Sequence, residues 1–333
     1  MSQLYVDEAG TKLRVHENRL QICYPDTNVK EIPVEAVDGI TILGNAQLTT
    51  QCMQLCLKRG ISVSFFSKGG SYFGRLQSSG HVNTERQRFQ CSLYGTVFSI
   101  DLAKQITRSK IHNQKVILSR YGKSREIDVY DPVSKMERCR EKIKNSISID
   151  EINGYEGYAA RIYFEGLATV IEPDFAFRGR SRRPPQDEFN SLISLGYSIL
   201  MNTLYESIEN KGLNPYFGFM HQDKEKHPTL ASDLMEEWRA PLVDSTAMSL
   251  INGHELRKEH FCLDHENGGC FLTKDGLKIF LIKLEKKMQE KIKYLKYVTY
   301  PVSFRQAIRL QIEQLVFAMQ EQNANKYQPL EIR

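Results

Sequence analysis

Three apolar segments of this 333-residue sequence contain acidic or histidine side chains. Glu156 lies in the segment GYEGYAARIYF, at the predicted beginning of a helix, and His221 ends the apolar segment NPYFGFMH. Asp233 and Glu236 are three residues apart, which places them on one face of a predicted helix, with Arg239 in the same row. These side chains could form parts of a metal site.

A histidine together with two carboxylates forms a mixed nitrogen and oxygen ligand set. Such a set suits Mn²⁺ or Mg²⁺ acting on phosphates better than structural zinc, which prefers closed, cysteine-rich sites. A divalent ion bound there would neutralise a phosphodiester, activate a water or hydroxyl, and stabilise the leaving oxygen. Structural interpretations stay open beside it: an acid that stabilises the first turn of its helix, an ordinary surface histidine, and a solvated acidic stripe.

A basic loop follows the first of these segments. Four arginines lie within six residues, preceded by aromatic residues and followed by two prolines: Arg178, Arg180, Arg182 and Arg183. Guanidinium groups bind phosphates through paired hydrogen bonds, so this loop could clamp a nucleic-acid backbone. Alternatively, some of the arginines pair internally, while Asp187 and Asn190 cap the long apolar helix that comes next.

Basic residues are unevenly distributed along the chain. The whole chain has a formal net charge of +5, but residues 104–144 hold twelve Lys and Arg against five acids, a net charge of +7. Residues 151–333 hold 23 basic and 25 acidic residues, a net charge of −2. Arg138, Arg140 and Lys142 in the basic segment could contact a phosphate backbone, or they could simply form a solvated helix face.

The elements that would position these side chains fall into two classes. Up to about residue 75, alternating apolar residues predict a hairpin over 13–22, buried strands over 40–43 and 61–66, and one helix over 46–57. From about residue 93 a period near 3.6 predicts helices over 102–121, 136–147, 157–168, 191–211, 233–250, 277–298 and 303–322. We therefore expect an α+β fold with a β-rich domain at 1–85, a linker at 86–100, and a mainly α-helical domain at 101–333.

Composition narrows the class of protein further. The hydrophobic share of 41% is enough to bury ordinary cores, and no apolar run of about 18 residues predicts a membrane span. We expect no signal peptide in the N-terminal residues MSQLYVDEAG, because no positively charged region is followed there by an apolar stretch. The seven cysteines include no Cys-x-x-Cys pair, and the spacing of His260, Cys262, His265 and Cys270 fits no standard zinc module. We expect reduced thiols and a cytoplasmic location.

With these segments in this order, the sequence resembles the CRISPR-associated adaptation integrase family. This family comprises the larger, metal-dependent endonuclease of the two proteins found in nearly all CRISPR systems. The resemblance covers essentially the whole chain and is most specific in GYEGYAARIYF, FRGRSRRPPQDEFNSLISLGYSIL, NPYFGFMH and LASDLMEEWRAPLVD. Beyond about residue 300 no motif contributes to it.

The resemblance implies a set of site residues. The family's catalytic residues and ligands of Mg²⁺ or Mn²⁺ fall on Glu156, His221 and Glu236, although many members have an aspartate at the last position. Asp233 and Lys224 match positions that support the site or contact DNA. The family's basic loop matches the four arginines between residues 178 and 183.

The resemblance also implies a reaction and an assembly. The 3′-hydroxyl of a short foreign DNA would attack a phosphodiester at the edge of a CRISPR repeat, a transesterification. The β-rich domain would form a homodimer, and two such dimers would flank a dimer of a small ferredoxin-like CRISPR protein. Two alternatives remain: a stand-alone metal-dependent nuclease acting on branched DNA or RNA, and a DNA-binding scaffold without chemistry.

Overall fold

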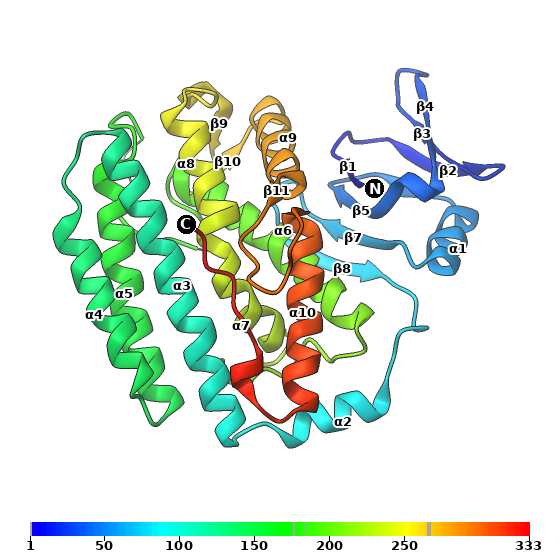
Figure 1. The fold of residues 1–333 in the computed structure, drawn as a ribbon. Helices are drawn as coiled ribbons and strands as arrows, with labels where there is room; N and C mark the ends of the chain where they lie inside the picture. Colours follow the sequence, from blue (N-terminus) through cyan, green and yellow to red (C-terminus); the bar gives the residue numbers. More distant parts are fainter. Residues whose placement is uncertain (1, 176, 183, 265–267) are drawn as a thin grey trace. The chain divides into compact units, whose positions relative to one another are not determined.

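The computed structural model describes residues 2–175, 177–182, 184–264 and 268–333, and the chain forms two compact units, Met1–His81 and Val82–Arg333 (Figure 1). The first unit is β-rich and the second is mainly helical, which confirms the predicted α+β fold. Residues 86–100, for which the sequence predicts a linker, lie inside the second unit. They form most of one helix, a turn, and the beginning of the next helix.

The first unit contains a sheet with the strand order β1-β5-β7-β8. β1, β5 and β7 are parallel to one another, and β8 is antiparallel to β7 at the edge of the sheet. These strands span β1 Ser2–Val6, β5 Val37–Leu43, β7 Ser62–Phe66 and β8 Tyr72–Leu76.

A second sheet of this unit has the order β4-β3-β2-β6, and it includes the predicted hairpin. Its strands are β2 Lys12–His16, β3 Arg19–Cys23, β4 Val29–Pro33 and β6 Gln47–Leu48. Helix α1, Thr50–Arg59, ends at Gly60, whose φ of 68° is the left-handed conformation that favours glycine at this position. Both sheets and α1 contribute to one core that contains Leu13, Ile40 and Cys52.

The second unit consists mainly of helices connected by short segments. Its α-helices are α2 Thr84–Ser92, α3 Val97–Ser124, α4 Tyr130–Lys144, α5 Ile149–Val170, α6 Glu188–Asn210, α7 Thr229–Trp238, α8 Ser245–Asn252, α9 Lys274–Gln289 and α10 Phe304–Gln320. Its short strand pairs are β9 Phe261–Leu263 with β10 Cys270–Leu272, and β11 Lys291–Ile292 with β12 Val302–Ser303. Among the helices that the structure describes, none is long and apolar enough to cross a membrane.

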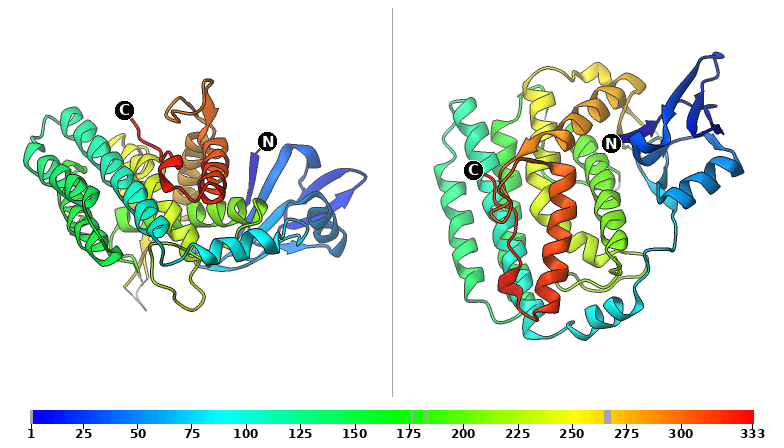
Figure 2. Two further views of the ribbon diagram at one scale, coloured as in Figure 1. Left: turned by 60° about the horizontal axis from the view of Figure 1, so that its bottom comes forward. Right: turned by 45° about the vertical axis from the view of Figure 1, so that its right-hand side comes forward.

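Helix α7 lies at the centre of this unit, and all of its residues are buried. Helices α3, α4 and α5 lie side by side in both views of Figure 2. The C-terminal segment runs beside α3 and α7, where the Asn113 amide donates to Leu330 O and Glu237 O at 2.9 Å each. The middle of α3 therefore faces the most buried helix of the molecule.

A π-helix, η2 Arg239–Asp244, continues α7 into α8. Pro241 lies within it and has no N–H to donate, so an ordinary α-helical ladder would lose a hydrogen bond there. π-Helical turns occur frequently at functional sites because they change the direction of the side chains around them. In this chain η2 begins at Arg239, two residues after Glu237 of α7.

Two sequence-based expectations for the helices are wrong. Glu156 does not begin a helix: α5 starts at Ile149, because Ser148 Oγ accepts from Glu151 N at 3.2 Å, and Glu156 lies two turns further on. The predicted helix over 277–298 ends at Gln289, because the backbone then leaves the helix to form the β11–β12 pair. The dipole interpretation of Glu156 therefore fails, since that effect is confined to the first turn.

Candidate metal centre

Glu236 forms the buried part of the centre. It lies on α7 with a side chain only 5% exposed, and three nitrogen-bearing side chains surround it. Arg239 Nε donates to Glu236 Oε1 at 3.1 Å, Lys110 Nζ lies 2.5 Å from Oε2, and His221 Nε2 lies 4.0 Å from Oε1. Arg239, which the helical spacing places in the same row, thus pairs with Glu236 in the structure.

Glu156, on α5, is the second carboxylate of the centre. Its Oε1 forms an ion pair with the same Lys110 ammonium that contacts Glu236. Lys110 comes from α3, so one lysine joins carboxylates from two other helices. The side chain of Glu156 is 22% exposed and that of His221 is 36% exposed, against 9% for Lys110, so the centre meets solvent at Glu156 and His221.

The ionic surroundings keep these groups charged despite burial. Burial favours the neutral form of Glu236, but Arg239, Lys110 and His221 outweigh it and lower the pKa of this carboxyl to about 2. Burial likewise lowers the pKa of Lys110, yet attraction to Glu156 and Glu236 leaves that pKa above its ordinary value. The centre is therefore a cluster of ionised groups that compensate one another.

Asp233 orients His221. His221 Nδ1 lies 2.7 Å from Asp233 Oδ1, and an ionised carboxylate only accepts hydrogen bonds, so Nδ1 carries the proton. In the neutral ring Nε2 then has a free lone pair on the side of Glu236. A histidine whose other nitrogen donates to a carboxylate is the usual arrangement of a metal-binding histidine.

The same carboxylate also fixes the loop that carries His221. Asp233 Oδ2 accepts from Phe219 N at 2.6 Å and from Met220 N at 3.0 Å, and Oδ1 accepts from His221 N at 3.0 Å. Gly218 makes this close approach possible, because a Cβ there would lie 2.8 Å from Asp233 Oδ2. The apolar segment that ends in His221 is thus wrapped around one buried aspartate.

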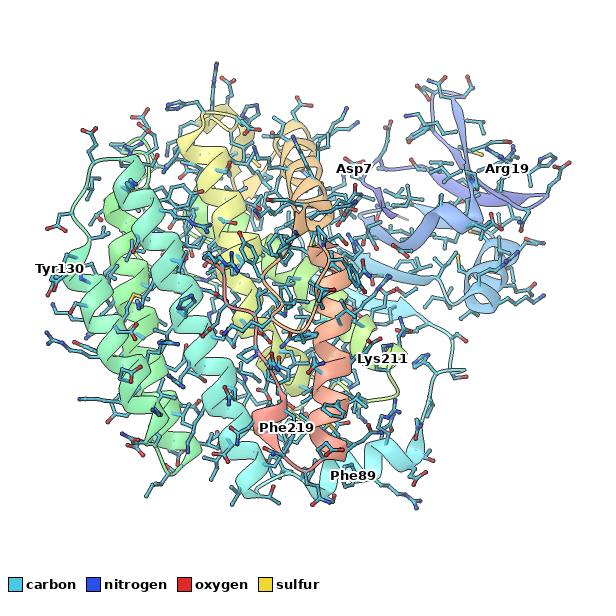
Figure 3. All side chains as sticks on the ribbon, viewed as in Figure 1. Asp7, Arg19, Phe89, Tyr130, Lys211 and Phe219 are labelled. Carbon is cyan, nitrogen blue, oxygen red and sulfur yellow. The ribbon has the colours of Figure 1, made fainter. Side chains whose placement is uncertain are left out.

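A second contact to this loop comes from α2. The Gln90 amide donates to Asn214 O at 2.9 Å and to Phe217 O at 2.7 Å, and it accepts from Asn214 N at 2.8 Å. Figure 3 shows the side chains of this region, with Phe89 labelled on α2 and Phe219 on the loop. Gln90 is buried, and its amide group stabilises the loop before His221.

Behind Arg239 lies a second buried cluster. Tyr163 donates to Asp244 Oδ2 at 2.9 Å, Tyr197 donates to Asp244 Oδ1, and burial raises the pKa of Asp244 to about 6. The Arg239 guanidinium stacks on Tyr197 at 4.5 Å from the ring centroid, and the Arg180 guanidinium lies 5.5 Å from the same centroid. The tyrosine thus fixes the arginine that pairs with Glu236.

The donor set of the centre fits a hard divalent cation. Glu156 and Glu236 offer carboxylate oxygens and His221 offers Nε2, the ligands that Mg²⁺ and Mn²⁺ accept. As they stand, no three His, Cys, Asp or Glu side chains in the described part of the chain are grouped closely enough to hold a metal ion. The position between the two carboxylates holds the Lys110 ammonium instead, so a cation already occupies it.

Lys110 is the member of the centre that the sequence patterns do not single out. In sequence it belongs to the basic residues of 104–144, whereas the structure turns it inward. The sequence does carry a signal, because Lys110 follows Ala103 and Ile106 at helical spacing and precedes Ile117 by seven residues, and all three of these residues are buried. A lysine within the buried stripe of a helix requires a charged partner.

The basic loop divides into exposed and internal side chains. Arg178 and Arg182 are exposed, while Arg183 lies outside the described residues. Arg180 is internal: its Nη1 donates to Asn190 Oδ1 at 2.8 Å and to Ser194 Oγ at 3.1 Å. Asn190 in turn is held by the N-cap of α6, as expected, since Asp187 Oδ1 accepts from Asn190 N at 2.7 Å.

The other predicted DNA contacts also differ in their surroundings. Arg138 on α4 and Lys224 in the α6–α7 loop are exposed, and Lys142 lies 5.5 Å from the centroid of the Tyr155 ring, beside Glu156 on α5. Arg140 pairs with three carboxylates, at 3.1 Å from Glu137, 3.7 Å from Glu141 and 3.2 Å from Glu331. This pairing favours an internal role for Arg140.

Fold and centre together define an α+β protein with a β-rich unit and a helical unit that buries a carboxylate and histidine centre. Solved structures share this fold. A CAS1 protein from Thermotoga maritima is similar with a TM-score of 0.81 at 23% identity, covering 95% of this chain and 96% of that one. A chain of a Cas6-RT-Cas1–Cas2 complex matches with a TM-score of 0.85 at 26% identity, covering all of this chain and 36% of its own length.

Sequence comparison gives the family. The model of the family described as CRISPR associated protein Cas1 matches residues 4–286. A relative from Mycobacterium tuberculosis named CRISPR-associated endonuclease Cas1 is 34% identical over 317 residues, which is 95% of this chain and 93% of the relative. One of the same description from Thermus thermophilus is 33% identical over 79% of this chain and 76% of its own length. The chain belongs to the CRISPR-associated Cas1 family, as the sequence motifs predicted.

Proposed function

We propose that this protein is a metal-dependent DNA endonuclease and integrase of CRISPR adaptation. It joins the 3′-hydroxyl ends of short foreign DNA to the CRISPR repeat by transesterification. The observation that carries this proposal is the convergence of Glu156 and Glu236 on one cation, with Nε2 of His221 4.0 Å from Oε1 of Glu236. Membership of a family whose relatives are named endonucleases supports the reaction class.

Glu156, His221 and Glu236 would hold Mg²⁺ or Mn²⁺ in this proposal. When bound, the ion supplies activation of the attacking hydroxyl and neutralisation of charge on the phosphodiester. Asp233 keeps the proton on Nδ1 of His221 and so leaves Nε2 free to bind. Arg239 holds Glu236 in position through Oε1. No side chain forms a covalent bond to DNA, because the substrate's own hydroxyl is the nucleophile.

DNA would be bound by exposed basic side chains of the helical unit. Arg178, Arg182, Arg138 and Lys224 are exposed and free to contact phosphates. Lys142 is exposed as well and lies 5.5 Å from the ring centroid of Tyr155, the residue before Glu156 in α5. Since phosphate contacts give affinity without reading sequence, these groups would position the DNA while the repeat and partner proteins supply specificity.

The assembly is the other part of the proposal. We expect a homodimer formed by the β-rich unit, whose edge strand β8 carries Phe73, 73% exposed, and Tyr72, 42% exposed. A small ferredoxin-like protein would bind as a dimer between two such dimers. The structural neighbour from a Cas6-RT-Cas1–Cas2 complex supports the presence of a partner protein. The reaction would take place in the cytoplasm, where free thiols stay reduced.

An integration assay tests this function. The full chain is incubated with its small partner, a short duplex with free 3′-hydroxyls, a plasmid that carries a repeat, and Mn²⁺ with or without a chelator. We expect metal-dependent joining that disappears with Glu156→Ala and with blocked 3′ ends. Glu165→Ala is the matched control, because Glu165 is an exposed acid on the same helix.

The same assay separates the alternatives. Metal-dependent cutting without joining would make the protein a stand-alone nuclease. Binding of DNA with neither reaction would make it a scaffold. Joining that survives Glu156→Ala would contradict the assignment of the centre while leaving the family intact.

A further inference from the structure

Lys110 has surroundings that are unusual for a lysine. Its side chain is 9% exposed, and its ammonium contacts one oxygen of Glu156 and one oxygen of Glu236. Burying an ammonium is costly unless charged partners surround it, and here two carboxylates from different helices do so. Lys110 thus links α3 to α5 and α7 at the position where the proposed ligands meet.

The two proposed carboxylate ligands already have cationic partners without any added ion. Glu156 and Glu236 contribute two negative charges, and Lys110 and Arg239 contribute two positive charges, while Asp233 is paired with His221 at 2.7 Å. A divalent cation added to this cluster would bring a surplus of positive charge into a buried site. Charges separated by a few ångströms repel strongly there, because the protein interior screens them less than water does.

The ammonium and a divalent ion also need the same oxygens. Arg239 engages Oε1 of Glu236 and Lys110 engages Oε2, so both oxygens of this carboxylate already have a cationic neighbour. Arg239 is further held by its stacking on Tyr197, at 4.5 Å from the ring centroid. Lys110 has a flexible four-carbon stem, so it is the cation that can withdraw most easily.

We propose that Lys110 is a built-in counter-ion that holds Glu156 and Glu236 together in the metal-free protein and is displaced when the divalent ion binds. This inference rests on the metal site of the proposed function. Lys110 thereby prevents the two carboxylates from repelling one another and preserves their positions. The consequence is a lower affinity for metal, because each binding event must break the two lysine ion pairs.

The test replaces Lys110 with methionine, which keeps the unbranched stem and removes the charge. Mn²⁺ affinity is measured by calorimetry, and thermal unfolding is followed with and without Mn²⁺. We expect the metal-free unfolding midpoint of Lys110→Met to fall below that of the unchanged protein, and its Mn²⁺ affinity to rise about tenfold or more. Added Mn²⁺ should therefore raise its midpoint by more than it raises that of the unchanged protein.

Lys115→Met is the matched control. Lys115 lies on the same helix and pairs with Glu137 of α4, away from Glu156 and Glu236, so its removal should leave the Mn²⁺ affinity unchanged. Lys110→Gln serves as a second neutral variant in case Lys110→Met folds only in the presence of metal. It should change the Mn²⁺ affinity in the same direction, and refolding of Lys110→Met with Mn²⁺ should succeed where refolding without it fails.

The outcomes distinguish this inference from the function on which it rests. If the unchanged protein binds no Mn²⁺, the proposed metal site fails, and the inference fails with it. If the unchanged protein binds Mn²⁺ but the Lys110 variants bind it equally or more weakly, only the counter-ion role is overturned. An unaltered metal-free midpoint in both variants would also overturn it.

Discussion

Glu236 and Glu237 are adjacent residues on α7, both buried, yet their carboxyl groups have opposite properties. Glu236 faces Lys110, Arg239 and His221, and its pKa is lowered to about 2. Glu237 faces the C-terminal segment, where burial raises its pKa to about 8 although the Tyr327 hydroxyl and Leu330 N donate to it. Successive side chains of a helix point in different directions, so the two adjacent glutamates have different surroundings. Glu236 lies among cations, whereas Glu237 holds the C-terminal segment.

This difference shows that burial alone does not determine the charge of a carboxyl group. Desolvation favours the neutral acid at both positions, and only cationic neighbours reverse the outcome at Glu236. An ionised carboxylate in a low-dielectric site binds cations, whereas a neutral one mainly accepts and donates hydrogen bonds. The functional difference between the two glutamates therefore resides in α3 and η2, the elements that supply the cations.

The largest effect is expected from Glu236→Gln compared with Glu237→Gln. Glu236→Gln should reduce integration more than about 100-fold, since changing even an outer partner of a metal ligand costs about 10–100-fold. Glu237→Gln keeps hydrogen-bonding groups for the C-terminal segment and should leave integration within about threefold. Joining rates and Mn²⁺ calorimetry check both variants, and an equal loss in both would remove the distinction drawn between the glutamates.

A smaller effect is expected from changing Asp233, the residue that orients His221 near Glu236. Asp233→Asn weakens the group that keeps the proton on Nδ1 of His221 and that anchors the loop backbone. Mn²⁺ affinity should fall about 10–100-fold. Asp223→Asn, in the exposed part of the same loop, should leave the affinity unchanged. Equal affinities for all three proteins would show that Asp233 does not orient a ligand.

A still smaller change is expected from Gln90→Ala, which acts on the loop from α2. The substitution leaves Asn214 N and the carbonyls of Asn214 and Phe217 without their amide partner, at a cost of about 1–3 kcal/mol in unfolding free energy. Because Asp233 still holds His221, integration should fall only several-fold. Arg88→Ala, an exposed change on α2, is the control. A loss as large as that of Asp233→Asn would make Gln90 the main anchor of the loop.

The smallest expected effect is on the pH dependence of the unfolding free energy, which compares the two glutamates directly. The pKa of Glu237 is about 8 in the folded protein and 4.5 ordinarily, so between these values only the folded form keeps the proton. The free energy of unfolding should therefore fall as pH rises from 4.5 to 8, by up to about 1.4 kcal/mol per pH unit. Glu237→Gln should flatten this decline in denaturant titrations, and an unchanged slope would contradict the raised pKa.

Glu236 should act in the opposite direction. Its pKa is lowered from 4.5 to about 2, so the folded protein releases this proton more readily than the unfolded chain. Its stabilising contribution is present above pH 4.5 and is lost as pH falls toward 2. Denaturant titrations at pH 2 to 4.5 measure this contribution, and Glu236→Gln should reduce the loss of stability in that range while leaving the decline between pH 4.5 and 8.

Local patterns in the sequence were sufficient to predict the division into a β-rich and a helical part, because apolar periods of 2 and 3.6 involve only nearby residues. They also identified Asp233, Glu236 and Arg239 as one row, since their spacing of three matches a helical turn. The hairpin over 13–22 and the helix that stops before Gly60 followed from equally local signals. These predictions needed only neighbours in sequence.

Which distant groups share one cation depends instead on how the helices pack. Lys110 is 46 residues from Glu156 and 126 from Glu236, and its basic neighbours are typical of a solvated face. The opposite pKa shifts of Glu236 and Glu237 depend on α3, η2 and the C-terminal segment, which no local pattern specifies. Charge interactions act through space and depend on burial, so they are fixed only when the helices have packed.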